Sequence, residues 1–391
     1  MNDPKRVPFS EVGKVIAGQH IPSEDYNGDD HGTPYLTGPA DFTDRAPVVT
    51  KWTNHPRSFA ESGDVLLTVK GAGCGKSNLG LDAAIGRQLM ALRPMKAKLD
   101  RNYLFAFIQS QQERICALGQ GATVPGIGKG DIEKLQIPLP SLPEQRRIAA
   151  ILDKADAIRR KREEGIRLTE ELLRSTFLEM VGPTNSAYQN WPAYRIEEIA
   201  ASKPNSMRTG PFGSSLLHSE FVDEGIAVLG IDNAVNNRFA WGERRFITRQ
   251  KYEDMNRYTA YPGDVIVTIM GTTGRSAVLP DDLPCAITTK HLATITVNRD
   301  LLLPEILSES FFVNPVVLRQ IKAANRGAIM EGLNLGVIKK LVIHTPPMQQ
   351  QRAYQLARQG ILDMKTNRCS ASENAIDLFE SLVQRAFRGE L

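Results

Sequence analysis

Two glycine-rich segments hold the side chains of this chain that are best suited to bind a ligand. They read GAGCGKSN over residues 71–78 and GTTGRS over residues 271–276. Glycine lets a backbone approach a ligand closely, and lysine and arginine neutralise phosphates or pair with guanine edges. Threonine and glutamine can form hydrogen bonds with base edges, whereas the plain alternative for each residue is a solvated loop. We predict that the DNA-binding residues are Lys70, Lys76, Ser77, Arg87, Gln88, Thr272, Thr273, Arg275, Lys290 and His291.

A nucleotide-binding P-loop is the first alternative for the segment at 71–78. That motif needs four residues between its first glycine and its Gly-Lys pair. Gly71 and Gly75 are separated by only three residues, and the position with the required spacing is Lys70. The second segment carries Arg275 in place of the lysine. We therefore expect no ATP binding at either segment.

The rest of the sequence lacks the common motifs of catalysis. The six histidines are scattered, and none belongs to an H-E-x-x-H metal motif. The sequence contains no G-x-S-x-G nucleophile motif and no Asn-Pro-Pro-aromatic tetrad of the kind expected in an amino-methyltransferase. We therefore predict that this chain is not an enzyme and binds no metal ion or cofactor of its own.

Composition and charge set further limits on the class of protein. The 391 residues are 41% hydrophobic and 24% charged, which is typical of a folded globular protein of two or three domains. No run approaches the ~18 apolar residues of a membrane span, and the four cysteines are far apart and form no C-x-x-C pair. We therefore expect a cytoplasmic protein without a membrane partner. The net charge of +4 is compatible with a polyanionic partner but does not demonstrate one.

Sequence blocks recur along the chain in the same order. GDVLLTVKG at 63–71 is followed by GDVIVTIMG at 263–271, an offset of 200 residues. GATVPGIGKGDIEKLQI at 121–137 matches GAIMEGLNLGVIKKLVI at 327–343, an offset of 206 residues. The period is far too long for a solenoid repeat or a propeller blade. The growing offset indicates two copies of one domain-sized unit, with insertions in the second.

Each copy combines a mixed α/β part with a long helix. The runs after the Gly-Asp pairs and the runs LQIPLP and LVIHTPP predict short strands. No proline interrupts residues 144–181 before Gly182 and Pro183, and a second uninterrupted stretch covers 348–388. The predicted fold class is therefore mixed α+β. It consists of two α/β domains in a pseudo-twofold repeat, separated by two long antiparallel helices of coiled-coil type.

Apolar residues at alternating spacings of three and four support packing between these helices, although a helix packed on its own domain would show one such stripe as well. The C-terminal stripe consists of Ile361, Met364, Arg368, Ala371, Ala375, Leu378 and Leu382; the central one, polar in its middle, consists of Ile148, Ile151, Ala155, Ile158, Arg162, Gly165, Thr169 and Leu172. The resulting boundaries are 1–140 and 183–346 for the two α/β domains, and 141–182 and 347–391 for the helices.

One long block resembles a known protein family. PGIGKGDIEKLQIPLPSLPEQRRIAAILDKAD, residues 125–156, is similar to the end of a target recognition domain and the following conserved helix in type I restriction-modification specificity subunits. YPGDVIVTIMGTTGR at 261–275 and RTGPFGSSL at 208–216 resemble segments inside such domains. The resemblance covers nearly the whole chain. In the second copy TPPMQQQRAYQLA, at 345–357, departs from the helix-start pattern, which leaves open how symmetric the two helix starts are.

The resemblance implies a division of labour within a larger complex. Each recognition domain would read one half of a split, asymmetric double-stranded DNA target through the major groove, and the helices would set the unread spacer. Two modification subunits would bind the chain and methylate adenine. S-adenosylmethionine, ATP and Mg²⁺ would belong to partner subunits only. The sequence leaves open whether restriction subunits, up to two of them, also join.

Two other classes of function remain open at this stage. The first is a free-standing regulator that binds DNA with the same two domains but has no methyltransferase partner. The second is an enzyme with an unrecognised site in the glycine-rich segments. Turnover by the purified chain without partners would support the second class.

Overall fold

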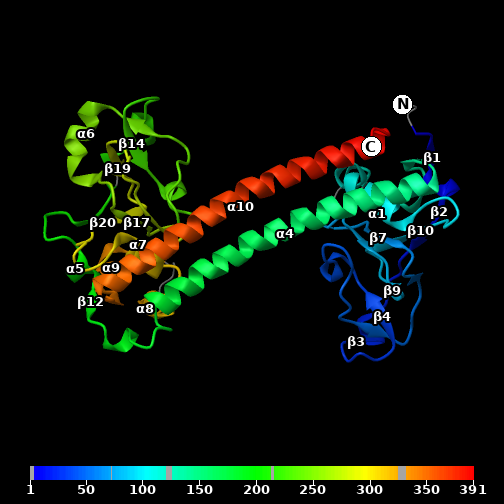
Figure 1. The fold of residues 1–391 in the computed structure, drawn as a ribbon, viewed down its shortest axis with the longest axis horizontal. Helices are drawn as coiled ribbons and strands as arrows, with labels where there is room; N and C mark the ends of the chain where they lie inside the picture. Colours follow the sequence, from blue (N-terminus) through cyan, green and yellow to red (C-terminus); the bar gives the residue numbers. More distant parts are fainter. Residues whose placement is uncertain (1–3, 72, 120–125, 213–214, 325–331) are drawn as a thin grey trace. The chain divides into compact units, whose positions relative to one another are not determined.

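The chain is described here by a computed structural model that covers residues 4–71, 73–119, 126–212, 215–324 and 332–391 (Figure 1). Parts of the sequence segments at 71–78, 121–137, 125–156, 208–216 and 327–343 lie outside these described residues. The structure divides into two compact units. Unit 1 consists of Met1–Glu164 with Cys369–Leu391, and unit 2 consists of Gly165–Arg368.

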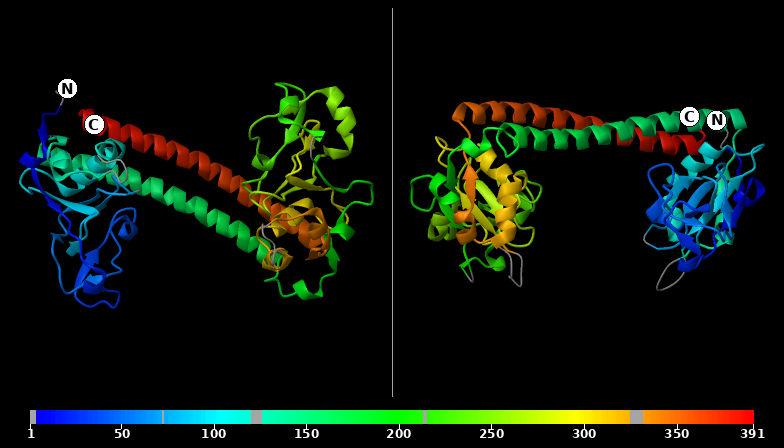
Figure 2. Two further views of the ribbon diagram at one scale, coloured as in Figure 1. Left: turned by 180° about the vertical axis from the view of Figure 1, so that it is seen from behind. Right: turned by 90° about the horizontal axis from the view of Figure 1, so that it is seen from below.

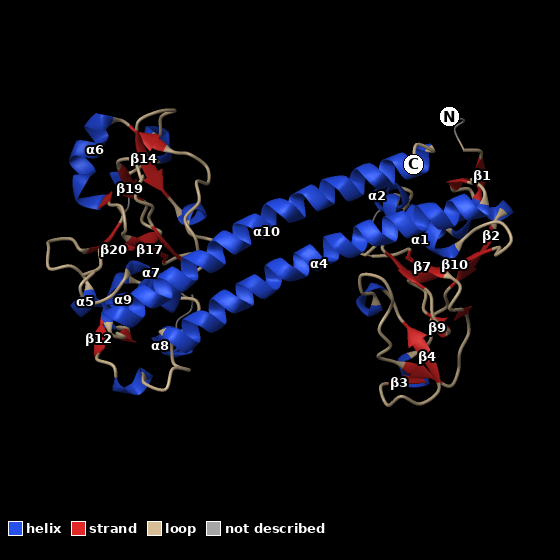
Figure 3. Cartoon of the chain, viewed as in Figure 1, coloured by secondary structure: helices blue, strands red, loops and turns tan. Residues whose placement is uncertain are grey.

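Unit 1 is built on an antiparallel sheet with the strand order β2-β10-β7-β8 (Figure 3). Strand β7, which GDVLLTV predicts, is buried along its whole length. A second sheet has the order β3-β5-β4-β9-β6 with β4 and β9 parallel, and β1 pairs with β11. The strands are β1 (Arg6–Pro8), β2 (Gly13–Ala17), β3 (Tyr26–Asn27), β4 (Thr33–Leu36), β5 (Trp52–Thr53), β6 (Phe59–Ala60), β7 (Val65–Thr68), β8 (Ser77–Leu79), β9 (Ala83–Ile85), β10 (Leu89–Pro94) and β11 (Gln136–Pro138).

Unit 2 repeats the topology of the main sheet, while its second sheet has four strands where that of unit 1 has five. Its sheets have the orders β13-β20-β17-β18 and β15-β14-β19-β16, again with one parallel pair, β14 and β19, and β12 pairs with β21. The strand predicted from GDVIVTI is β17, the counterpart of β7, so the predicted duplication is confirmed. The strands are β12 (Ala193–Arg195), β13 (Met207–Thr209), β14 (Ile226–Leu229), β15 (Phe246–Ile247), β16 (Thr259–Ala260), β17 (Val265–Thr268), β18 (Ser276–Val278), β19 (Ala286–Thr288), β20 (Leu292–Ile295) and β21 (Val342–His344).

Two long helices, α4 (Leu142–Met180) and α10 (Met348–Arg388), confirm the helices predicted at 144–181 and 348–388. Each contributes one part to unit 1 and another to unit 2. No helix among the described residues is long and apolar enough to cross a membrane. The shorter helices are α1 (Arg101–Ser110), α2 (Gln112–Ala117) and α3 (Lys129–Glu133) in unit 1, and α5 (Ile196–Ile199), α6 (Arg249–Met255), α7 (Pro304–Ser310), α8 (Pro315–Ala324) and α9 (Leu335–Lys340) in unit 2.

The core of unit 1 joins its main sheet to both long helices. Ile148 of α4 and Phe387 of α10 are buried in the same cluster as the strands β7 and β10. The Phe387 ring stands edge-on to Tyr103 and Phe107 of α1, with ring centroids 5.5 and 5.2 Å apart. Arg6 of β1 donates a hydrogen bond to the Phe387 carbonyl, so β1 lies beside the end of α10 in unit 1 (Figure 2).

Unit 2 uses the opposite ends of the same helices. Phe177 and Val181, near the end of α4, are buried beside Tyr354, near the start of α10. The rings of Phe177 and Tyr354 meet edge to face at 5.7 Å. Each long helix therefore begins against the core of one unit and ends against the core of the other.

The polar middle of the central stripe has a structural role. In unit 1, Arg162 of α4 donates to the backbone carbonyl of Ala371 in α10. In unit 2 the roles are exchanged, and Arg368 of α10 donates to the carbonyl of Gly165 in α4 over 3.0 Å. A Cβ atom at position 165 would lie 2.5 Å from the Arg368 guanidinium, so glycine makes room for this bond. The two helices thus contact each other antiparallel within each unit.

The apolar stripes are only partly correct as a description of the seam. Ile361 and Ala375 are buried, but Met364 and Leu378 are 42% and 57% exposed, and Leu172 of α4 is exposed as well. A strict seven-residue spacing drifts by ~20° per heptad around a straight helix. The buried face of α10 therefore moves from the predicted positions to residues such as Leu362 and Ser372.

This register predicts unequal effects for two neighbouring leucines of α10 in unit 1. Leu382 packs against the unit 1 core, whereas Leu378 faces solvent. Leu382→Ala should lower the free energy of unfolding by about 1–2 kcal/mol, because the folded state loses the burial of part of a leucine side chain. Leu378→Ala is the matched control and should change it by less than ~0.5 kcal/mol. Urea denaturation followed by circular dichroism measures both, and equal losses would contradict the observed register.

Candidate nucleic-acid interface

The first glycine-rich segment is the loop of a hairpin between β7 and β8. The Thr68 N–H donates to the Lys76 carbonyl, and the Gly75 N–H donates to the Thr68 carbonyl, both over 2.8 Å. Gly71 and Gly75 have φ angles of 81° and 83°, a conformation that favours glycine. The loop therefore presents Lys70 and Lys76, which are exposed, at its two ends.

The second segment forms the same hairpin between β17 and β18. The Thr268 N–H donates to the Arg275 carbonyl over 2.8 Å, and the Gly274 N–H donates to the Thr268 carbonyl over 2.9 Å. Gly271 and Gly274 have φ angles of 73° and 82°. The matching bonds make Arg275 the counterpart of Lys76. The residue before the first positive-φ glycine is Met270 here and Lys70 in unit 1.

A short turn lies beside each hairpin loop. In unit 1 it joins β9 to β10 and contains Arg87 and Gln88, and the Val69 N–H donates to the Gln88 carbonyl over 2.9 Å. In unit 2 it joins β19 to β20, and the Ile269 N–H donates in the same way to the His291 carbonyl over 2.9 Å. Arg87 therefore corresponds to Lys290, and Gln88 to His291.

All ten predicted residues thus lie at one end of the main sheet in their own unit. We call this end the loop edge: residues 68–71, 73–77 and 86–88 in unit 1, and residues 268–276 and 289–291 in unit 2. Most of the ten are exposed, Thr273 and His291 are half-buried, and Ser77 is buried in β8. DNA contact by any one of them stays a prediction.

The loop edges hold unsatisfied polar groups. Four buried atoms there have no hydrogen-bond partner within the described part of the chain: Thr68 Oγ1, Ser77 Oγ, Thr289 Oγ1 and His291 Nδ1. Burial lowers the pKa of His291, and the charge of Lys290 adds to this, so the imidazole is neutral near pH 7. A neutral ring can accept a hydrogen bond as well as donate one. The cations at the edges, such as Lys76 and Arg275, have no carboxylate within ion-pair distance among the described residues.

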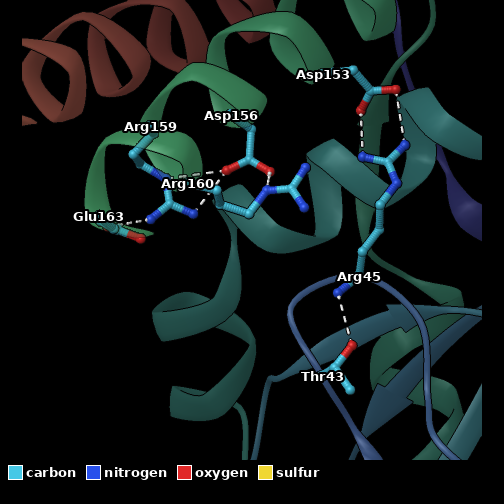
Figure 4. A network of polar contacts seen from close by, with 7 residues as sticks. All are labelled: Thr43, Arg45, Asp153, Asp156, Arg159, Arg160 and Glu163. Carbon is cyan, nitrogen blue, oxygen red and sulfur yellow. Dashed lines mark hydrogen bonds and ion pairs between the residues drawn. The ribbon is translucent and has the colours of Figure 1, made fainter. Parts of the chain in front are cut away.

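Arg159 and Arg160 of α4 and the nearby Arg45, in contrast, form ion pairs within the protein. Arg45, whose carbonyl accepts a hydrogen bond from Leu79 of β8, makes two 2.9 Å bonds to Asp153 of α4 (Figure 4). The bond to Asp153 raises the pKa of Arg45. Asp156 binds Arg159 and Arg160 at 2.8 and 3.0 Å. These cations therefore anchor the sheet and order the helix surface.

Two glutamines fix the start of each long helix to the unit in which that helix begins. The sequence reasoning missed both of them. The Gln145 amide donates to the carbonyls of Lys98 and Pro140 and accepts from the Asp100 N–H, over 2.8–2.9 Å. Gln351 does the same with Leu301, Pro346 and Leu303, over 2.7–2.9 Å. The repeat offset of 206 aligns the two glutamines and could have revealed them. The two helix starts are therefore equivalent despite their different sequences.

Nothing in the described residues suggests a metal centre. No group of three or more histidine, cysteine, aspartate or glutamate side chains is arranged to hold a metal ion in the part of the chain that the structure covers. The arrangement at the loop edges is instead suited to a polyanion with hydrogen-bonding edges.

Comparison with known proteins gives a consistent result. Residues 1–168 match the family described as "Type I restriction modification DNA specificity domain". The chain is 34% identical over 169 residues to the putative type I restriction enzyme MjaX specificity subunit of Methanocaldococcus jannaschii, which covers 42% of this chain and 40% of the relative. It is 24% identical to the EcoKI specificity subunit of Escherichia coli K12 over 80% of this chain and 70% of the relative. The chain spans less than half the length of the two M. jannaschii relatives that it matches.

Solved structures show the same architecture. The S subunit of a type I restriction-modification system from M. genitalium has a TM-score of 0.61 at 16% identity, with 98% of this chain and 96% of that chain covered. A structure described as the basis of complex assembly and conformational transition of the type I R-M system also has a TM-score of 0.61, at 18% identity and essentially full coverage of both chains. At such identities the likeness establishes the fold, and it confirms the predicted mixed α+β class.

Proposed function

We propose that the chain is a type I restriction-modification specificity subunit, as its similarity to such proteins supports, and that it selects the DNA sequence on which a modification complex acts. Each unit uses its loop edge to read one half of a split target through the major groove. The chain supplies recognition only and carries out no catalysis.

The single observation that carries this proposal is the equivalence of the two loop edges. Residues separated by about 200 positions occupy the same hydrogen-bonded places in the two units: Lys76 and Arg275, Arg87 and Lys290, Gln88 and His291. Exposed cations such as Lys76 and Arg275 can neutralise phosphates or pair with guanine edges. A duplicated site with these properties is suited to a ligand that is itself a repeated polyanion.

The residues at equivalent places differ between the units, and this difference supports an asymmetric target. Lysine and arginine pair with guanine edges, glutamine pairs with adenine, and a neutral histidine can accept from an amino group. Gln88 and His291 therefore present different hydrogen-bonding groups at equivalent places of the two units.

The partners in this proposal are DNA and two modification subunits. The modification subunits, which bind the cofactors, carry out the methylation. S-adenosylmethionine, ATP and Mg²⁺ are accordingly assigned to the partners. One relative's structure is described as addressing complex assembly of the type I R-M system, which supports a role within an assembly. Restriction subunits are a further proposed component.

Single alanine substitutions at equivalent places should affect different halves of the target. Lys76→Ala should change only the first half-site, and Arg275→Ala only the second. Loss of a base contact costs about 1–3 kcal/mol of binding free energy and relaxes one position. Loss of a phosphate contact instead weakens binding evenly and lowers the salt slope by about one. Binding-site selection with the modification subunits present measures both.

Lys14→Ala is the matched control, because Lys14 is exposed near the other end of the same sheet, on β2. Its affinity and target should remain those of the wild type. If neither Lys76→Ala nor Arg275→Ala changed affinity or specificity, the loop edges would not be the DNA-reading surface. If the chain bound its target in the host without a modification subunit, the regulator would be the better assignment.

A further inference from the structure

One position of the loop edges differs in chemical class between the units. Lys70 and Met270 each stand directly before the first positive-φ glycine of the hairpin loop, Gly71 or Gly271. Both side chains are exposed, and Met270 is 46% exposed. Two other paired positions keep a cation in both units, Lys76 with Arg275 and Arg87 with Lys290, and Gln88 and His291 are both polar. The site before the glycine alone exchanges a cation for a large apolar side chain.

A second apolar side chain accompanies Met270 at the same edge. Strand β13 leaves the sheet through Gly210, where a Cβ atom would lie 2.0 Å from the Thr288 carbonyl, and Phe212 follows with 55% of its surface exposed. In unit 1 the equivalent step is Gly18, where a Cβ atom would lie 2.1 Å from the Gly86 carbonyl. The residue two positions after Gly18 is the polar, exposed His20. The unit 2 edge therefore presents two exposed apolar side chains, Met270 and Phe212, beside its cations, whereas the equivalent places in unit 1 hold Lys70 and His20.

The major groove offers one apolar group to such a side chain. Thymine presents a 5-methyl group there, whereas guanine presents the two acceptors N7 and O6 that lysine binds. The thioether of methionine is flexible and polarisable, so it can cover a methyl group that a fixed ring would miss. We propose that Met270 reads the methyl group of a thymine in the second half-site, and that Lys70 reads a guanine at the equivalent place in the first half-site. This inference rests on the proposed function and names the base edges that two residues select.

Uracil is the probe that isolates the methyl contact. It pairs with adenine as thymine does but lacks the 5-methyl group. In the complex with its modification subunits, the wild-type chain should bind about fourfold more weakly when one thymine of the second half-site is replaced by uracil, which is the effect of losing one buried methyl-sized group. Uracil at thymines of the first half-site should not show this Met270-dependent loss.

Substitutions at the two positions complete the test. Met270→Lys should lose the sensitivity to uracil and should select guanine in place of that thymine. Lys70→Met should abolish the loss of affinity that 7-deazaguanine, which lacks the N7 acceptor, causes in the first half-site. Met270→Ala keeps the loop glycines and should lose the uracil effect without gaining a guanine preference.

The outcomes separate this inference from the function on which it rests. If the wild-type complex selects no split target, the proposed function is wrong. If it selects a split target but the second half-site contains no uracil-sensitive thymine, the assignment of Met270 is overturned and the function stands. The same conclusion follows if Met270→Lys and Met270→Ala keep the full uracil effect.

Discussion

Replacing Arg358 by methionine is expected to lower the free energy of unfolding of unit 2 by about 3–5 kcal/mol, the usual cost of removing one partner from a buried ion pair. The Arg358 Nε atom lies 2.5 Å from Oε1 of Glu309, whose side chain is 3% exposed. Tyr354 donates its hydroxyl to the other carboxylate oxygen. Methionine fills a similar volume but leaves the carboxylate buried with only a neutral partner. Urea denaturation followed by tryptophan fluorescence measures the loss, because unit 2 contains Trp191 and Trp241.

The matched control removes the negative charge of Glu309, which Arg358→Met leaves buried without a cation. Adding Glu309→Gln to Arg358→Met should restore most of the lost stability, because an amide can still accept the Tyr354 hydroxyl and carries no charge. An Arg358→Met chain as stable as the wild type would mean that the ion pair does not support the start of α10.

The loss of stability caused by Arg358→Met should also depend on pH in a definite direction. Burial raises the pKa of Glu309, and Arg358 and Tyr354 oppose that rise. A carboxyl group with a raised pKa in the folded state contributes stability that is present below its unfolded pKa and is lost as the pH rises through the folded pKa. Removing Arg358 takes away one opposing influence. The destabilisation by Arg358→Met should therefore be smaller at acidic pH and should grow toward neutral pH.

Much of the architecture could be predicted from the sequence because the chain contains it twice. The GDV runs identify β7 and β17, and the proline-free stretches identify α4 and α10 to within a few residues. The seam of the helices could not be predicted, because an apolar spacing does not reveal how a helix is rotated. Leu378 fits the spacing and faces solvent, while Arg368 fits it and binds a carbonyl across the seam.

The candidate site was predicted residue by residue, but the pairing of its residues required the structure. The blocks GDVLLTVKG and GDVIVTIMG align Lys70 with Met270 directly. The hairpin loop itself is one residue shorter in unit 2, and the connection from β18 to β19 is longer than that from β8 to β9, so the offset changes. Only the bonds from Val69 and Ile269 to the neighbouring turn place Gln88 opposite its counterpart, His291. The burial of Ser77 could not be predicted either, because a residue next to a glycine-rich loop gives no sign that it belongs to the following strand.

The central claim is that the two loop edges read separate halves of one target. The most direct test exchanges one proposed recognition domain and leaves the other unchanged. In the chimeric chain, residues 183–346, the proposed second recognition domain, are replaced by the matching domain of a relative with a different target. The long helices and residues 1–140 keep their native sequence, so Gln145 still anchors the start of α4 to the carbonyls of Lys98 and Pro140.

The measurement is methylation-sensitive sequencing of host DNA from cells that carry the wild-type or the chimeric chain with its modification subunits. We predict that methylated sites in both strains share the same first half-site and that only the second half-site changes, to the one read by the relative. Methylated sites that change in both halves, or in neither half, would contradict independent reading by the two loop edges.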